Sequence, residues 1–162
     1  MNADNIVFHH LAIALRLELT AVNQYLLHSH LLRDWGFDKL AEKIREEMSE
    51  EAGHADLLIE RQLFLKSTPD PSKLDEIKFV TSVREMLDLD LESERVALKA
   101  YVEAAADCEK VGDYVSRNLF VTLISDEEHH IEWLEKQLGL MKHLGDGIYL
   151  QSQMGAAGGD NG

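Results

Sequence analysis

Hydrophobic residues recur every three or four positions along four long segments of the chain. In residues 5–34 they include Leu11, Leu15 and Tyr25, a spacing typical of the buried face of an α-helix. Similar spacing fills residues 38–66, 82–110 and 113–139, and only a few residues separate the first segment from the second and the third from the fourth. The pattern predicts an all-α protein with four long helices.

The ends of these segments carry residues that stop and start helices. Gly36 and Gly112 follow the first and third segments, and glycine is common just beyond a helix C-terminus. The expected N-caps are Asp38, Asp113 and the capping box that Ser82 opens. The first two and the last two helices are therefore expected to form antiparallel hairpins.

The connection between the hairpins, residues 67–81, contains both prolines and no clear period. Fully extended, it would reach about 50 Å, whereas a helix of 25 residues is about 37 Å long. It can therefore run the length of the bundle. We predict one domain, residues 1–154: a four-helix bundle with one long crossover and a short fifth helix over 148–154. Residues 155–162 are expected to be disordered.

One glutamate interrupts the apolar stripe near the middle of each long helix: Glu18, Glu51, Glu94 and Glu127. A carboxylate in a protein core is costly unless it is paired or binds a metal. The alternative at this point is that all four stripes are rotated and the glutamates are exposed.

Two histidines, His54 and His130, lie three residues after Glu51 and Glu127, so each shares a helix face with its glutamate. The Glu-x-x-His motif alone is weak, but its combination with Glu18 and Glu94 matches a bundle-core site for two metals. Glu51 and Glu127 would bridge metals about 3.5–4 Å apart. Glu18 with His54, and Glu94 with His130, would each complete one metal. This ligand set suits iron or manganese.

The 162 residues include 16 Lys and Arg against 30 Asp and Glu, a net charge of −14. This charge argues against binding nucleic acid or an anionic membrane. No apolar run is long enough for a transmembrane helix, and the N-terminus lacks the pattern of a signal peptide. The single Cys108 suits a reducing compartment, so we expect a cytoplasmic protein.

The segments LRLELTAVNQYLLH, HADLLIERQLFL and DEEHHIEWLEKQLGL, with the six spaced ligands, resemble the bacterioferritins over residues 5–154. The resemblance implies a ferritin-like cage of 24 subunits that oxidises Fe(II) with O₂ or H₂O₂ and stores the Fe(III) mineral. It maps the six residues onto a di-iron ferroxidase centre. Tyr25 matches a tyrosine beside that centre, a candidate electron donor; a core aromatic is the alternative. A ferredoxin-type protein would be the reductant for iron release.

One departure concerns haem. Bacterioferritins bind haem b between two subunits through a methionine from each, which directly follows the bridging glutamate of the second helix. Here that residue is Ala52, which has no atom to ligate iron. Met48, one turn earlier, is a candidate substitute or a core methionine. Haem-less family members co-assemble with haem-binding subunits, and Ala52 suits that role.

Other function classes remain open from the sequence alone. They are another di-iron oxidoreductase such as a peroxidase, a non-catalytic iron-binding or DNA-protecting shell, and a purely structural bundle. Glu46, Glu47 and Glu50 cluster beside Glu51 and either guide iron inward or form a solvated acidic face.

Overall fold

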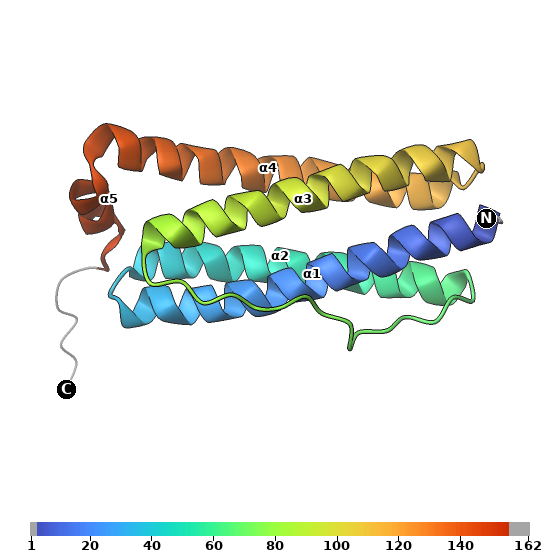
Figure 1. The fold of residues 1–162 in the computed structure, drawn as a ribbon, viewed down its shortest axis with the longest axis horizontal. Helices are drawn as coiled ribbons and strands as arrows, with labels where there is room; N and C mark the ends of the chain where they lie inside the picture. The colour runs from blue at the N-terminus through green and yellow to red at the C-terminus, as the bar shows by residue number, and fades with distance from the viewer. Residues whose placement is uncertain (1–2, 156–162) are drawn as a thin grey trace.

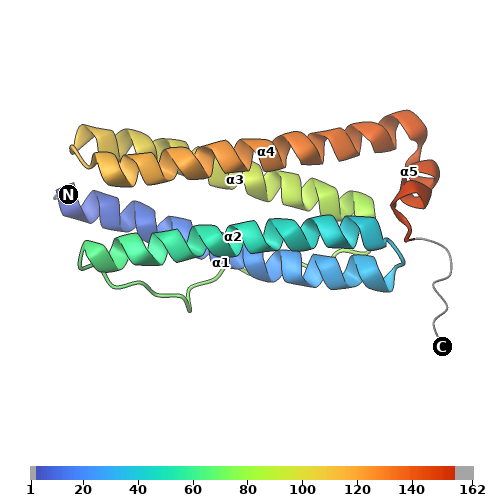
Figure 2. The ribbon, with the colours of Figure 1, turned by 180° about the vertical axis from the view of Figure 1, so that it is seen from behind.

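Five helices and no strand make up the described part of the chain, residues 3–155 of a computed structural model (Figure 1). They are α1 (Ala3–Asp34), α2 (Asp38–Phe64), α3 (Val83–Lys110), α4 (Tyr114–Leu144) and α5 (Asp146–Gln153). The four long helices form a bundle, and α5 lies across one end (Figure 2). The predicted fold class is confirmed. The tail predicted to be disordered lies outside the described residues from 156 onward.

The two hairpins turn in the same way. Gly36 and Gly112 have φ of 92° and 79°, values in the left-handed region that favour glycine. The N–H of the next residue donates back to the Leu32 carbonyl in the first turn and to the Cys108 carbonyl in the second. This pattern satisfies carbonyls that the helix end would otherwise leave free.

Two of the three predicted N-caps are correct. Asp113 and Ser82 each accept a hydrogen bond from the backbone N–H three residues further on, at 2.9 and 3.2 Å. The prediction for Asp38 is wrong. Phe37 occupies the cap position without a side-chain bond, and Asp38 is the first residue of α2. There its negative charge interacts favourably with the helix dipole.

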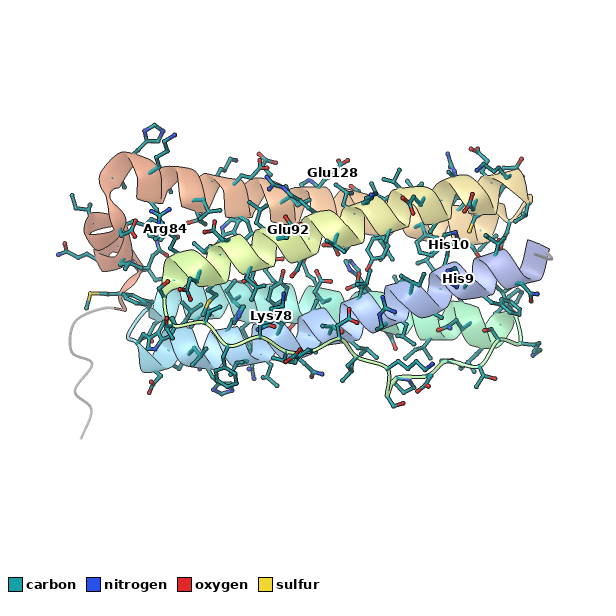
Figure 3. All side chains as sticks on the ribbon, viewed as in Figure 1. His9, His10, Lys78, Arg84, Glu92 and Glu128 are labelled. Carbon is teal, nitrogen blue, oxygen red and sulfur yellow. The ribbon has the colours of Figure 1, made fainter. Side chains whose placement is uncertain are left out.

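Helix α4 continues past Gly139, where the sequence predicted its end. Its buried face continues to Met141, and Gly145, with φ of 80°, ends it. The fifth helix follows at once and begins two residues earlier than predicted. Arg84, at the start of α3 and labelled in Figure 3, pairs with Asp146 at the start of α5. Gly139 inside α4 costs only about 1 kcal/mol, and packing of Met141 against the core offsets this cost.

The crossover, residues 67–81, lies along α1 (Figure 1). The backbone N–H of Asp75 donates to Thr20 Oγ1 at 2.9 Å. Gln24 accepts from the backbone N–H of Lys78 and donates to the Lys78 carbonyl, both at 2.9 Å. Polar side chains of α1 therefore fasten this irregular segment, and Lys78 lies in front of α1 in Figure 3.

The core consists of two apolar clusters with polar side chains between them. The first includes Leu11, Leu15 and Phe120, and the second includes Leu32 and Leu134. Buried glutamates and histidines separate the clusters at the middle of the bundle. At this level of the bundle, polar side chains replace the apolar packing of the core.

By length and hydropathy alone, residues Asn5–Asp34 would reach across a membrane, with a mean hydropathy of 1.2 in an 18-residue window. A helix in the core of a bundle passes the same test. Here α1 buries Glu18 and His28 against the other helices, which fits a core helix. The absence of a membrane-spanning segment stays a prediction.

The pair between His28 and Asp90 is fully buried, with Nδ1 and Oδ1 2.9 Å apart. Replacing His28 by leucine is expected to lower the free energy of unfolding by about 3–5 kcal/mol, because Asp90 would lose its partner. Urea denaturation measures this. Arg95→Ala is the control, since it breaks only an exposed pair with Glu135 worth at most about 1 kcal/mol. Equal losses in the two variants would contradict the prediction.

Candidate metal centre

Six polar side chains converge at the middle of the bundle. Each is at most 5% exposed. They come from all four long helices: Glu18 from α1, Glu51 and His54 from α2, Glu94 from α3, and Glu127 and His130 from α4. The alternative of four rotated stripes with exposed glutamates is therefore wrong.

These side chains form two overlapping groups. Glu18 and His54 join Glu51 and Glu127 in the first, and Glu94 and His130 join the same two glutamates in the second. Within each group, one ligand atom per residue lies within 4.8 Å of the others. The two shared carboxylates occupy the positions expected of bridges between two metals.

The atoms that face one another at the centre lack ordinary partners. His54 Nδ1 lies 3.3 Å from Glu18 Oε1, and His130 Nδ1 lies 2.9 Å from Glu51 Oε1. None of these contacts has hydrogen-bond alignment within the described residues. The buried atoms left without a hydrogen bond there include Glu18 Oε2, Glu51 Oε1, both Glu127 oxygens and both histidine Nδ1 atoms. Buried donors and acceptors are normally satisfied, so this donor set fits a pair of bound metal ions.

The outward nitrogens of both histidines contact carboxylates between α2 and α4. His54 Nε2 lies 2.8 Å from Asp126, and His130 Nε2 lies 2.5 Å from both Glu47 and Glu50. A carboxylate on one ring nitrogen leaves the other free to ligate a metal. Sequence reasoning missed Asp126. The available signal was its place directly before Glu127.

The acidic cluster of Glu46, Glu47 and Glu50 on α2 has both buried and exposed members. Glu47 is buried at 4% exposure beside His130, so its interpretation as part of a solvated face is wrong. That interpretation fits Glu46, which is exposed.

Two buried tyrosines donate to the outer glutamates. The Tyr25 hydroxyl donates to Glu94, and the Tyr101 hydroxyl donates to Glu18 Oε1 at 2.6 Å. Sequence reasoning singled out only Tyr25. Burial, followed by the charge of Asp90 for Tyr25 and of Glu18 for Tyr101, raises both pKa values well above the usual range. Both hydroxyls therefore keep their protons and remain donors.

The centre repeats along the chain with a constant separation, although no repeat stood out in the sequence. The matched positions are 76 residues apart: 18 and 94, 25 and 101, 36 and 112, 50 and 126, 51 and 127, and 54 and 130. They hold glutamate, tyrosine, glycine, an acid, glutamate and histidine. The repeat is hidden because the residues between these positions differ.

Close carboxylates control the charge of the two histidines. Burial alone would lower the histidine pKa values, but Glu127 and the neighbouring carboxylates outweigh it and raise the pKa of both His54 and His130 far above 6.5. Burial and the nearby Glu18 raise the pKa of Glu51. These raised pKa values favour protonated histidines that balance the carboxylates without metal, so a metal ligated by these nitrogens would displace their protons.

Metal-free protein is expected to be more stable at pH 6 than at pH 8.5. The histidines bind protons more tightly in the folded state, so their contribution is complete below the unfolded pKa of 6.5 and declines as pH rises toward the folded value. Urea denaturation with a chelator at both pH values measures this difference. In His54→Gln, the difference should shrink; an unchanged pH dependence would contradict the assignment.

Two hollows reach the centre from opposite faces. One, of about 230 Å³, lies beside the crossover; its lining includes Gln24, Lys78, Glu51 and Glu94. The other, of similar volume, is on the α2–α4 face beside His130. Small molecules and ions thus have short routes to the buried carboxylates.

The two residues considered for haem lie on α2. Met48 is half-buried and packs against the second apolar cluster, an environment that fits a core methionine. Ala52 is exposed. No atom of Ala52 is able to ligate iron, so the residues at this position do not fit the haem site described for the resembling family.

Comparisons with known proteins agree on one family. Residues 9–144 match the family described as the ferritin-like domain. The chain is 49% identical to the bacterioferritin of Rhodobacter capsulatus over 145 residues, 90% of each chain. It is 50% identical over 141 residues to the bacterial ferritin of a Synechocystis strain, covering 86% of this chain and 90% of that one.

A solved structure of the Rhodobacter capsulatus bacterioferritin superposes with a TM-score of 0.91 and 46% identity, over 96% of each chain. That structure is described as having a metal-free dinuclear site and haem iron. The similarity covers the whole bundle, including all four helices that supply the converging side chains.

Proposed function

The chain belongs to the ferritin-like family as a bacterioferritin, and we propose that it stores iron by oxidising Fe(II) at the buried centre. Iron storage is the function that the family names support. The substrate is Fe(II), the oxidant is O₂ or H₂O₂, and the product is an Fe(III) mineral held in a hollow shell. Six buried side chains with unsatisfied atoms facing one another are the observation that supports this most strongly.

The chain's own residues have distinct parts in this function. Glu51 and Glu127 would hold both irons, and the hydrogen bonds that the outward histidine nitrogens donate to Asp126 and Glu50 would orient the imidazoles. Two adjacent Fe(II) substrate ions would together supply two electrons to one oxidant molecule. The two hollows would let ions and oxidant reach the centre without unfolding the bundle.

The cellular setting is also part of the proposal. We place the protein in the cytoplasm, as a homo-oligomer or in mixed shells with a haem-binding subunit, with a ferredoxin-type reductant for iron release. Its net charge of −14 disfavours a DNA-protecting role.

Mineral storage separates this function from that of another di-iron oxidoreductase. Purified metal-free protein is given many equivalents of Fe(II) in air and then passed through a size-exclusion column with iron analysis. Far more than two Fe(III) per chain should elute with the protein. Oxidation limited to two irons per chain, with the rest precipitating, would instead favour the oxidoreductase.

The native particle is expected to be about 24 times the chain mass of 18.4 kDa. A closed shell buries the faces of the bundle against neighbouring copies, so the particle should persist on dilution. Analytical ultracentrifugation measures its mass. Monomers or dimers at every concentration would contradict the cage.

A further inference from the structure

The two halves of the centre are built alike, and only one of their tyrosines follows from the family resemblance. Tyr25 of α1 donates to Glu94 of α3, while Tyr101 of α3 donates to Glu18 of α1. Each tyrosine lies seven residues after the glutamate of its own helix. The hydroxyl–carboxylate bonds therefore cross between the same two helices in opposite directions.

The ring of Tyr101 packs in the apolar core, and its hydroxyl donates to Glu18. The residue is 1% exposed, belongs to the first apolar cluster, and its ring lies 6.0 Å from that of Phe120. The buried polar pair of His28 and Asp90 lies near Tyr25. The positions that match this pair in the 76-residue repeat hold alanines, Ala104 and Ala14. Burying a hydroxyl costs free energy unless it forms a hydrogen bond, and Tyr101 forms its bond with Glu18.

The hydrogen bond from Tyr101 also gives the two oxygens of Glu18 different surroundings. Oε1 accepts from Tyr101, whereas the buried Oε2 has no hydrogen bond within the described residues. A carboxylate fixed through one oxygen presents the other in a defined direction before a metal arrives. Such outer partners typically contribute 10–100-fold to metal affinity.

We propose that Tyr101 is a positioning residue that orients Glu18 to receive the metal held by Glu18 and His54. The inference deepens the proposed function and rests on its two-metal centre. It assigns one tyrosine to each metal position, so loss of the Tyr101 hydroxyl weakens one position and leaves the other unchanged.

The test is an anaerobic titration of full-length, metal-free protein with Co(II), followed by its visible absorption. Wild type should bind two Co(II) per chain tightly, whereas Tyr101→Phe should bind one tightly and one about 10–100-fold more weakly. Tyr149→Phe is the matched control, because it removes another buried hydroxyl, bonded to Gln137 in α5's contact with α4. Two unchanged Co(II) sites in Tyr101→Phe would overturn the proposal.

A coupling experiment separates orientation of Glu18 from a general effect on packing. In the Glu18→Ala background, adding Tyr101→Phe should leave the remaining Co(II) affinity unchanged. A further loss there would overturn the assignment. If Tyr101→Phe does not fold, wild type labelled with 3-fluorotyrosine provides the test. The Tyr101 resonance, assigned by elimination through variants of the other tyrosines, should shift when Zn(II) is added, and an unchanged resonance would overturn the proposal.

Failure of the proposed function has a different signature. Wild type that binds two Co(II) but does not oxidise Fe(II) would overturn the ferroxidase function and leave the Tyr101 assignment supported by the titrations. Normal Fe(II) oxidation with unchanged Co(II) binding by Tyr101→Phe would overturn the Tyr101 assignment alone. Wild type without any Co(II) binding would overturn both.

Discussion

Oxidation of the first two Fe(II) per chain is expected to slow by at least about 100-fold in Glu18→Ala, Glu94→Ala and His130→Ala. Outer-shell partners of a metal already contribute 10–100-fold, and these substitutions remove direct ligands. Each leaves one metal position incomplete, so two irons no longer supply electrons together. Stopped-flow absorbance at two Fe(II) per chain measures the rate.

The matched control is Glu60→Ala, which removes an exposed acid from α2. It should oxidise Fe(II) like wild type. If the three centre variants also oxidised the first irons at the wild-type rate, oxidation would have to occur elsewhere. The acidic hollow on the α2–α4 face, which contains Glu47 and Glu50, would then be the site to test.

Two substitutions at the centre, His130→Ala and Glu18→Gln, should differ in their effect on stability, and the structure refines what the sequence suggests. From sequence, removal of any ligand would relieve repulsion among buried carboxylates. In the structure, close carboxylates raise the pKa of His130 far above its usual value, which favours a protonated ring that balances their charge, so His130→Ala should destabilise metal-free protein. Glu18→Gln keeps an oxygen for Tyr101 and removes one charge, so its stability should equal or exceed that of wild type. All variants should lose the stabilisation that added metal gives.

The four buried glutamates were predictable because each interrupts the apolar stripe of its own helix. Glu18 interrupts an apolar stripe that includes Leu15 and Val22, and a charge buried in a core needs a partner or a metal. Four such interruptions at the middle of four helices predicted the convergence, while the helical periodicity and the long connection at residues 67–81 predicted the fold around it. The glycines at 36 and 112 placed the hairpin turns for a similar reason, since their left-handed conformations disfavour other residues.

The supporting residues were not predictable because they break no rule. Asp126 and Glu50 occupy partly or fully exposed positions where acids are ordinary, and only the structure places them against the histidines. Tyr101 looks like any core aromatic until its hydroxyl meets Glu18. Asp38 failed as a cap for the opposite reason: the residue type was right, but the chain entered the helix one residue earlier.

Protein produced alone is expected to carry little or no haem, and Ala52→Met is expected to introduce it. Haem-binding bacterioferritins ligate haem b through a methionine at this position in each of two subunits. The alanine methyl group has no lone pair to donate. Because Ala52 is exposed on α2, a longer side chain fits there without disturbing the core.

The measurement is the Soret absorbance of purified protein from cells supplied with haem. Ala52→Met should reach about one haem per two chains, since two thioethers from adjoining subunits are needed for each iron. Ser49→Met is the control, because it places a thioether at another exposed position of α2 and should bind none. A strong Soret band in wild type that disappears in Met48→Leu would contradict the prediction. Met48 would then have left its place against the second apolar cluster to ligate haem, and the lost packing would show as reduced stability of the haem-loaded bundle.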